Sequence, residues 1–250
     1  MKTIGLSALI LAYVLPSYAI VKKMCESRDN IGLTTLKVDG AATVGPTLAK
    51  DVAQALNVDW VSGELYVSFS ASMKFPGRCH VELSSPNTTK KVVAVSSNGK
   101  KRNEGLDLPA LQVVTDEICA LLVVRGKDEA REEVNKHLQS LKVNTRQVSL
   151  GRFHGALAWV VGEPGEASSQ LWVYKPLLND PNNTPPIYPA RMRFTDDKSN
   201  KWDVQMYDWG SAVGSDWFPR AIEVSKGGEP QLKLTALTAD VKPKLADELF

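Results

Sequence analysis

Stretches in which every second residue is apolar dominate the second half of the chain, from about residue 143 to residue 238. Residues 190–194 place Ala190, Met192 and Phe194 on one side and two arginines on the other. This period of two is typical of a strand with one buried face. We therefore predict a large antiparallel sheet with one apolar and one polar face. Its strands in this half are expected at 143–150, 156–161, 170–175, 190–195, 202–209, 217–225 and 231–238, with a loop at 176–189.

The first half alternates strand-like patterns with helical ones. Apolar residues at every third or fourth position predict a buried helix from a cap at Asp107 to about Val124. A narrower apolar stripe predicts a surface helix from Asp128 to Leu141. The other elements expected here are a strand at 33–38 closed by a turn at 39–40, a helix at 46–56, and strands at 65–69, 79–83 and 91–96.

The N-terminus has the pattern of a secretory signal peptide. Lys2 supplies the positive start, residues 4–15 are apolar, and small residues precede a cleavage point after Ala19. We predict a signal peptide at 1–19 and one exported domain at 20–250, with no integral membrane segment after cleavage.

The formal net charge of +2 over 250 residues argues against a nucleic-acid partner. The small basic cluster at 100–102 is expected to be solvated loop charge. In the strand at 79–83, Cys79 faces the core while His80 faces solvent. An exported chain can form a disulfide, but three cysteines, Cys25, Cys79 and Cys119, leave the pairing open. Their spacing matches no metal motif, and no cofactor is expected.

No catalytic pattern stands out. The chain lacks the G-x-S-x-G nucleophile turn and a glycine-rich phosphate loop. Its paired carboxylates lie in a predicted turn and on a predicted helix surface. We therefore predict a protein that is not an enzyme. A hydrolase would need a serine or aspartate to meet His137 or His154 in space.

The apolar sheet face suggests a ligand. About ten strands offer it, and only two or three helices are available to cover it. A curved sheet whose concave side is imperfectly filled is a natural cavity, although the helices could instead fill it completely. The candidate ligand-binding residues lie on the apolar faces: Leu65, Val67, Phe69, Val81, Ile118, Leu122, Met192, Phe194, Val204 and Met206.

The order of elements resembles one known family. Residues 60–83, with a strand, a proline turn and a strand, resemble the early part of the periplasmic lipoprotein-carrier (LolA/LolB-like, outer-membrane lipoprotein-sorting) fold. Residues 97–100 resemble its turn after the third strand. Residues 155–162, 171–175, 189–192 and 217–222 resemble its later strands. The likeness covers about residues 60–250, in pattern rather than in a strict motif.

The resemblance implies an α+β, mainly antiparallel fold: a curved, unclosed β-barrel (half-barrel) wrapped around two or three helices. It also implies a periplasmic protein of the cell envelope that binds acyl chains of a lipid or lipoprotein in an apolar concavity. The family's arginine before the turn proline is replaced here by Phe75, and its aromatic pair after the turn by residues 100–103. The alternative is therefore a cell-envelope protein-interaction or stress-sensing module of the same fold, without lipid transfer.

Overall fold

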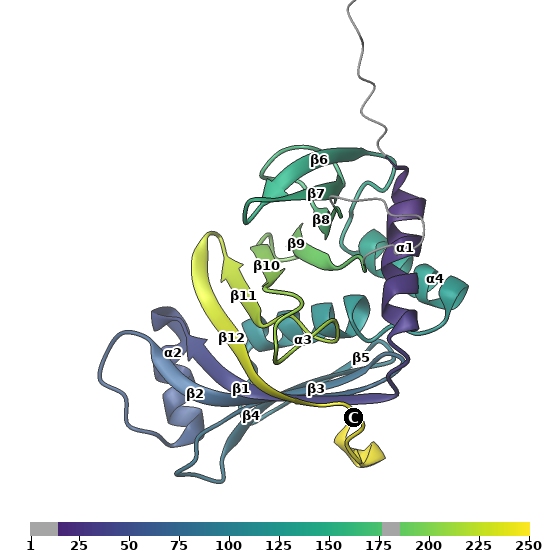
Figure 1. Cartoon of the computed structure of the whole chain (residues 1–250). Coiled ribbons are helices and arrows are strands. Elements are labelled where there is room, and N and C mark those ends of the chain that lie inside the picture. The colour runs from purple at the N-terminus through teal and green to yellow at the C-terminus, as the bar shows by residue number, and fades with distance from the viewer. Residues whose placement is uncertain (1–14, 177–185) are drawn as a thin grey trace, which may run out of the picture.

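A computed structural model describes residues 15–176 and 186–250. One twelve-stranded antiparallel sheet runs through this part of the chain in the order β5-β4-β3-β2-β1-β12-β11-β10-β9-β8-β7-β6. The sheet curves into a half-barrel with β5 and β6 at its two edges (Figure 1), which confirms the predicted fold class. The strands are β1 Thr35–Val44, β2 Leu65–Lys74, β3 Arg78–Ser84, β4 Lys91–Ser97, β5 Lys100–Glu104, β6 Val148–Phe153, β7 Ala156–Val161, β8 Gln170–Tyr174, β9 Pro189–Thr195, β10 Lys201–Tyr207, β11 Ala221–Lys226 and β12 Glu229–Asp240.

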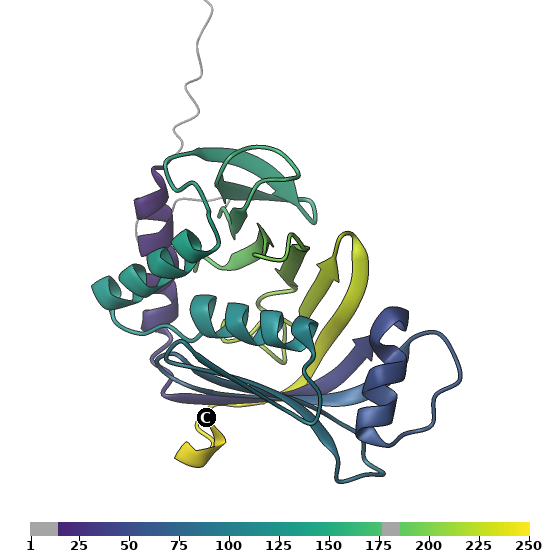
Figure 2. The same ribbon diagram turned by 180° about the vertical axis from the view of Figure 1, so that it is seen from behind.

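Four α-helices within the described ranges accompany the sheet. Helix α3 lies inside the half-barrel, between the β1–β5 half and the β9–β11 strands (Figure 2). Helices α1 and α4 pack against each other beside it, and α2 covers the inner face of β1, β2 and β4 at the other end. A short 3₁₀ turn, η1, ends the chain. The bounds are α1 Ser17–Asn30, α2 Pro46–Leu56, α3 Pro109–Leu121, α4 Lys127–Ser140 and η1 Asp247–Leu249.

Helix α3 is central because it is apolar on most of its surface. Leu111, Val114 and Ile118 are fully buried against the sheet, as the helical spacing predicts. The predicted cap was wrong, however. Leu108 takes the N-cap position without a side-chain hydrogen bond, and the Asp107 carboxylate instead accepts a hydrogen bond of 2.8 Å from the Asn103 side chain.

Strand β1 is longer than the sequence pattern indicates. The predicted turn at Asp39 and Gly40 is a bulge inside the strand, where the pairing with β12 shifts register. A Cβ atom at Gly40 would lie 2.1 Å from the carbonyl oxygen of Thr235. Glycine is therefore required by the close approach of β12, a role that a local pattern cannot distinguish from a turn.

The basic cluster at 100–102 is also corrected. It belongs to β5, an edge strand that pairs with β4, rather than to a loop. Its residues are all exposed, and lysines on an edge strand discourage pairing with other chains. The absence of apolar residues in this segment hid the strand.

The expectation that His80 faces solvent is wrong. Its side chain does point to the outer face of β3, opposite Cys79 and Val81, but only 6% of the residue is exposed. The outer face is therefore covered at this place. Burial lowers the pKa of His80, while Glu82 acts in the opposite direction.

Helix α1, like β5, is an element that the sequence pattern does not predict. Its buried residues Ile20, Val21, Met24 and Cys25 recur at helical spacing, but they directly follow the predicted signal peptide, where no element is predicted. Residues 1–14 of that signal, and 177–185 of the predicted loop at 176–189, lie outside the described part of the chain.

In the second half all the predicted strands form, with small changes at their ends. The largest difference is at β6, which begins at Val148 rather than at 143 because residues 144–147 form a turn after α4. Across residues 15–176 and 186–250, no helix is long and apolar enough to cross a bilayer.

Candidate functional site

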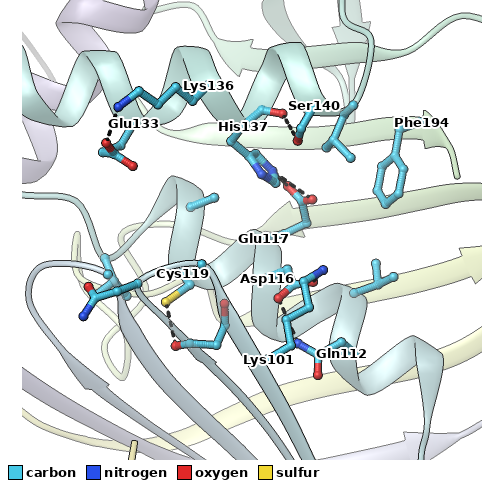
Figure 3. A pocket seen from close by; sticks show the side chains of 18 of the residues that line it. Lys101, Gln112, Asp116, Glu117, Cys119, Glu133, Lys136, His137, Ser140 and Phe194 are labelled. Atoms are coloured by element: carbon cyan, nitrogen blue, oxygen red, sulfur yellow. Dashed lines mark hydrogen bonds and ion pairs between the residues drawn. The ribbon is translucent and has the colours of Figure 1, made fainter. Parts of the chain in front are cut away.

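A groove of about 1030 Å³ runs along the outward side of α3. We call it the α3–α4 groove. Helix α4 forms one wall, and the β4–β5 hairpin forms another. The β9–β10 connection, residues 194–202, closes the far end. Figure 3 shows α4 side chains on one side and α3 side chains on the other.

The groove has an apolar base. Val113 and Ala120 of α3 and Leu141 after α4 are partly accessible in it, and the rings of Phe194 and Trp202 complete it at the β9–β10 end. A surface of this kind can hold a hydrocarbon chain without a polar anchor.

The walls are charged, and acids outnumber bases. Lys101 of β5 pairs with Asp116 at 2.6 Å, and Lys136 pairs with Glu133 at 3.0 Å. The lining holds three lysines, one arginine, one histidine and seven carboxylates: Lys101, Lys136, Lys198, Arg125, His137, Asp107, Asp116, Glu117, Glu129, Glu133, Asp196 and Asp197. The groove is thus net negative in a chain of net charge +2, which disfavours an anionic group inside it.

The β9–β10 end of the groove is fixed by Asp196. Its carboxylate accepts hydrogen bonds from the backbone N–H groups of Lys198 and Asn200, from the Asn200 amide and from the Trp202 indole. Partial burial raises the pKa of Asp196, but these hydrogen bonds lower it by more, so that the pKa falls below its usual value, to about 2. The Asp196 carboxylate is therefore ionised at neutral pH, and its hydrogen bonds fix the conformation of the turn.

A buried ion pair joins the two helices in the middle of the groove. Both carboxylate oxygens of Glu117 on α3 lie 3.1 Å from Nε2 of His137 on α4 (Figure 3). Glu117 is only 1% exposed. Burial lowers the pKa of His137, but the Glu117 carboxylate and its hydrogen bond outweigh it, so the pKa lies above its usual value.

The pair makes stability depend on pH in a defined direction. A histidine whose pKa rises on folding stabilises the fold fully below its unfolded pKa of about 6.5, and this contribution is lost as the pH rises through the folded pKa. We expect His137→Gln to destabilise the protein by about 1–3 kcal/mol at pH 6 and by less at pH 8.5.

Urea unfolding of the variant and the wild type at both pH values checks this. The opposite contribution of His80 is present in both proteins and cancels in the difference. An equal or larger loss at pH 8.5 would contradict the assigned ion pair.

Two contacts fix the C-terminal end of α3. A disulfide joins Cys79 of β3 to Cys119 of α3, with a Cα–Cα distance of 5.6 Å, while Cys25 is a buried free thiol. Arg28 of α1 donates to the Leu122 carbonyl at 3.1 Å. Helix α3 therefore cannot leave the sheet at this end while the disulfide is intact.

The structure places all ten sequence-predicted ligand residues in one core. Phe194 also borders the α3–α4 groove; the other nine pack between the sheet and the helices. A ligand contact at those nine needs a covering helix, α2 or α3, to move away from the sheet, and it stays a prediction. They are Leu65, Val67, Phe69, Val81, Ile118, Leu122, Met192, Val204 and Met206.

The two histidines named for a hydrolase have other partners. The His137 ring binds Glu117, and Ser140 donates to the His137 carbonyl oxygen rather than to its ring. The His154 ring stacks on Tyr207 at 4.6 Å. In the described ranges, no serine hydroxyl is hydrogen-bonded to either ring, and no group of three or more His, Cys, Asp or Glu could hold a metal ion.

The residues that shape the groove were missed by the sequence reasoning. Glu117 offers one signal: it is a charged residue three positions after Val114, on the apolar side of an otherwise buried helix. Such a carboxylate needs a buried partner. Its partner lies on another helix, 20 residues later, so the pattern alone could not identify His137.

No family model matches the sequence, and no curated protein matches it. Solved structures are similar at low identity. A LolA superfamily protein from Nitrosomonas europaea is 11% identical, with 95% of this chain and 98% of that chain covered and a TM-score of 0.49. A domain from Vibrio parahaemolyticus, provisionally called an outer membrane lipoprotein-sorting protein, is 10% identical, with 91% and 93% covered and a TM-score of 0.45. A DUF1329 family protein from Desulfovibrio piger is 10% identical, with 94% and 96% covered and a TM-score of 0.43.

Proposed function

We propose that this chain is an exported, periplasmic protein that binds an acyl chain of a lipid or lipoprotein in the α3–α4 groove. The observation that carries the proposal is the groove itself. It is an apolar-based hollow of about 1030 Å³, at the upper end of the usual size for ligand pockets, in a chain with the pattern of a signal peptide.

The energetics suit such a ligand. Each buried CH₂ group contributes about 0.8 kcal/mol, so ten of them contribute roughly 8 kcal/mol before the cost of association is subtracted. The net negative walls favour a ligand whose polar end is neutral or cationic over one with an anionic end.

The groove is accessible without movement of α3. Because the disulfide between Cys79 and Cys119 holds the C-terminal end of α3 on the sheet, binding between this end of α3 and the sheet would first require that bond to break. Binding on the outward side of α3 needs no such step, which is why we place the acyl chain there.

Filling the groove should weaken binding of the acyl chain. Ala120 is a small, partly accessible residue of α3 in the groove, and Ala120→Trp would occupy the space of several CH₂ groups. We expect at least a tenfold loss of affinity for monolaurin, since the loss of two buried CH₂ groups alone corresponds to about 1.6 kcal/mol.

The measurement is native mass spectrometry of the delipidated protein titrated with monolaurin below its micellar concentration. Ala55→Trp is the matched control, because Ala55 is partly buried on α2, outside the groove. No uptake by the wild type, or equal uptake by both tryptophan variants, would refute acyl-chain binding in the groove.

A further inference from the structure

A second hollow, of about 490 Å³, lies at the β9–β10 end of the α3–α4 groove. We call it the serine hollow; its lining residues are Lys142, Asn144, Glu163, Ala167, Ser168, Ser169, Thr195, Asp196, Asp197 and Ser199. They come from the turn after α4, from the connection between β7 and β8 and from the β9–β10 connection. Ala167 is the only apolar residue in this list. A hydrocarbon chain gains little from such a surface, so the hollow suits the polar end of a ligand.

The serine hollow and the α3–α4 groove are neighbours. Both are lined by Thr195, Asp196 and Asp197 of the β9–β10 connection. They also adjoin at the end of α4, where Leu141 lines the groove and the next residue, Lys142, lines the hollow. One elongated ligand can therefore extend from the apolar groove into the polar hollow.

The charged side chains of the serine hollow already have partners. Lys142 Nζ lies 3.3 Å from the Asp197 carboxylate, and the Asn144 amide donates to the Glu163 carboxylate at 2.9 Å. The Asp196 carboxylate accepts the four hydrogen bonds described above. A cationic headgroup would have to compete with these partners for a carboxylate. An anionic headgroup would face three carboxylates and a single lysine, which disfavours it.

The hydroxyl groups of the serine hollow are the polar groups that remain available. Four of them line it, and in the described part of the chain none is hydrogen-bonded to another residue. They belong to Ser168, Ser169, Thr195 and Ser199. A hydroxyl group both donates and accepts, so this set is complementary to the hydroxyl groups of a sugar or a glycerol.

We propose that the serine hollow binds the headgroup of the lipid whose acyl chain lies in the α3–α4 groove, and that this headgroup is uncharged and rich in hydroxyl groups. The inference rests on the proposed function, since the groove supplies the site for the chain. A volume of about 490 Å³ is within the usual range for a small-molecule site. The Lys142–Asp197 ion pair joins the end of α4 to the β9–β10 connection, with side chains 72% and 97% exposed. Such a pair contributes little to stability, so it can separate as the headgroup enters.

The test compares two esters that share the dodecanoyl chain, sucrose monolaurate and lauroylcholine. The chain makes the same contribution in both, so a difference in affinity reports on the headgroup. Isothermal titration calorimetry below the micellar concentration of each ester measures the two affinities. We expect sucrose monolaurate to bind the wild type at least tenfold more tightly, because about two additional hydrogen bonds correspond to that factor.

A double variant locates the headgroup. Ser168→Ala with Ser169→Ala removes two hydroxyl groups of the hollow and should weaken binding of sucrose monolaurate about tenfold. Its affinity for lauroylcholine should stay within about twofold of the wild type, because that headgroup carries no hydroxyl group. Ser70→Ala with Ser149→Ala is the matched control, since these serines are also half-buried but lie outside both cavities. The control should bind both esters as the wild type does.

The outcomes separate the headgroup site from the groove. If the two esters bind equally and Ala120→Trp weakens both, the acyl chain lies in the groove and the headgroup site is refuted. If neither ester binds, or if Ala120→Trp weakens neither, the proposed function fails and the headgroup site fails with it.

Three further results would overturn the headgroup site alone. The first is tighter binding of lauroylcholine than of sucrose monolaurate, which would indicate a cationic headgroup. The second is a loss of affinity for sucrose monolaurate that is the same in the two double-serine variants. The third is binding of free sucrose as tight as that of its ester, which would make the hollow a site for a free sugar.

Discussion

Replacing Arg28 by alanine is expected to lower the free energy of unfolding by about 3–5 kcal/mol. Arg28 is only 2% exposed. Its guanidinium donates to three backbone carbonyls, those of Leu122, Asp216 and Trp217, at 3.1, 2.7 and 2.7 Å. The substitution would leave these acceptors without their donors and leave a cavity where the side chain was.

The size of the effect follows from the geometry. Burial lowers the pKa of Arg28 to about 10, while Tyr188 and Asp216 act in the opposite direction, so the group stays charged at neutral pH. Its bonds are therefore charge-assisted, and they join α1, the end of α3 and the loop before β11. Lysine cannot reproduce the planar fork, so Arg28→Lys should be only partly tolerated.

Urea unfolding, with the midpoint and the slope both fitted, measures the change. Arg146→Ala is the control, because Arg146 is an exposed arginine whose removal should change the unfolding free energy by less than about 0.5 kcal/mol. A loss below about 1 kcal/mol for Arg28→Ala would contradict the buried network.

Removing the disulfide is expected to cost about 2–4 kcal/mol. The bond between Cys79 and Cys119 closes a loop with a sequence separation of 40, so its loss increases the conformational entropy of the unfolded chain. The double variant Cys79→Ala with Cys119→Ala also frees the C-terminal half of α3 from β3.

Cys25→Ala serves as the control. Burial raises the pKa of the Cys25 thiol to about 12, against the opposing influence of Arg131, so this thiol is a poor nucleophile for exchange with the disulfide. The control should still respond to a reducing agent, whereas the double variant should not. A double variant as stable as the wild type would contradict the assigned bond.

The disulfide variant also separates two locations for a ligand. If the acyl chain lies in the α3–α4 groove, monolaurin binding should survive loss of the bond. If it lies between α3 and the sheet, binding should appear or increase when α3 is freed.

The sequence pattern was sufficient for the architecture because a half-buried strand repeats every two residues. Strands such as β9 and β10 follow directly from Met192, Phe194, Val204 and Met206. Helix α3 follows from its long apolar face. Strand β5 could not be found in this way, since its residues are charged and its strand character comes from pairing with β4.

The candidate site was harder to predict because it depends on contacts between distant segments. The apolar faces identified Phe194, but not Val113 or Ala120, whose accessibility depends on where α4 and the 194–202 connection lie. The pair of Glu117 and His137 joins two helices that are separate in the sequence. The sequence does not indicate which two of the three cysteines form the disulfide. The sequence pattern indicates which face of a helix or strand a residue lies on, but not which residue of another element it contacts.

The most direct test of where the ligand binds is photocrosslinking with a monoacylglycerol that carries a diazirine on its acyl chain, followed by peptide mapping of the oxidised protein. We expect adducts on α3, on α4 and on residues 194–202, and their loss in Ala120→Trp. Adducts concentrated on Leu65, Val67 and Phe69, or adducts that form only after the disulfide is reduced, would contradict binding in the α3–α4 groove.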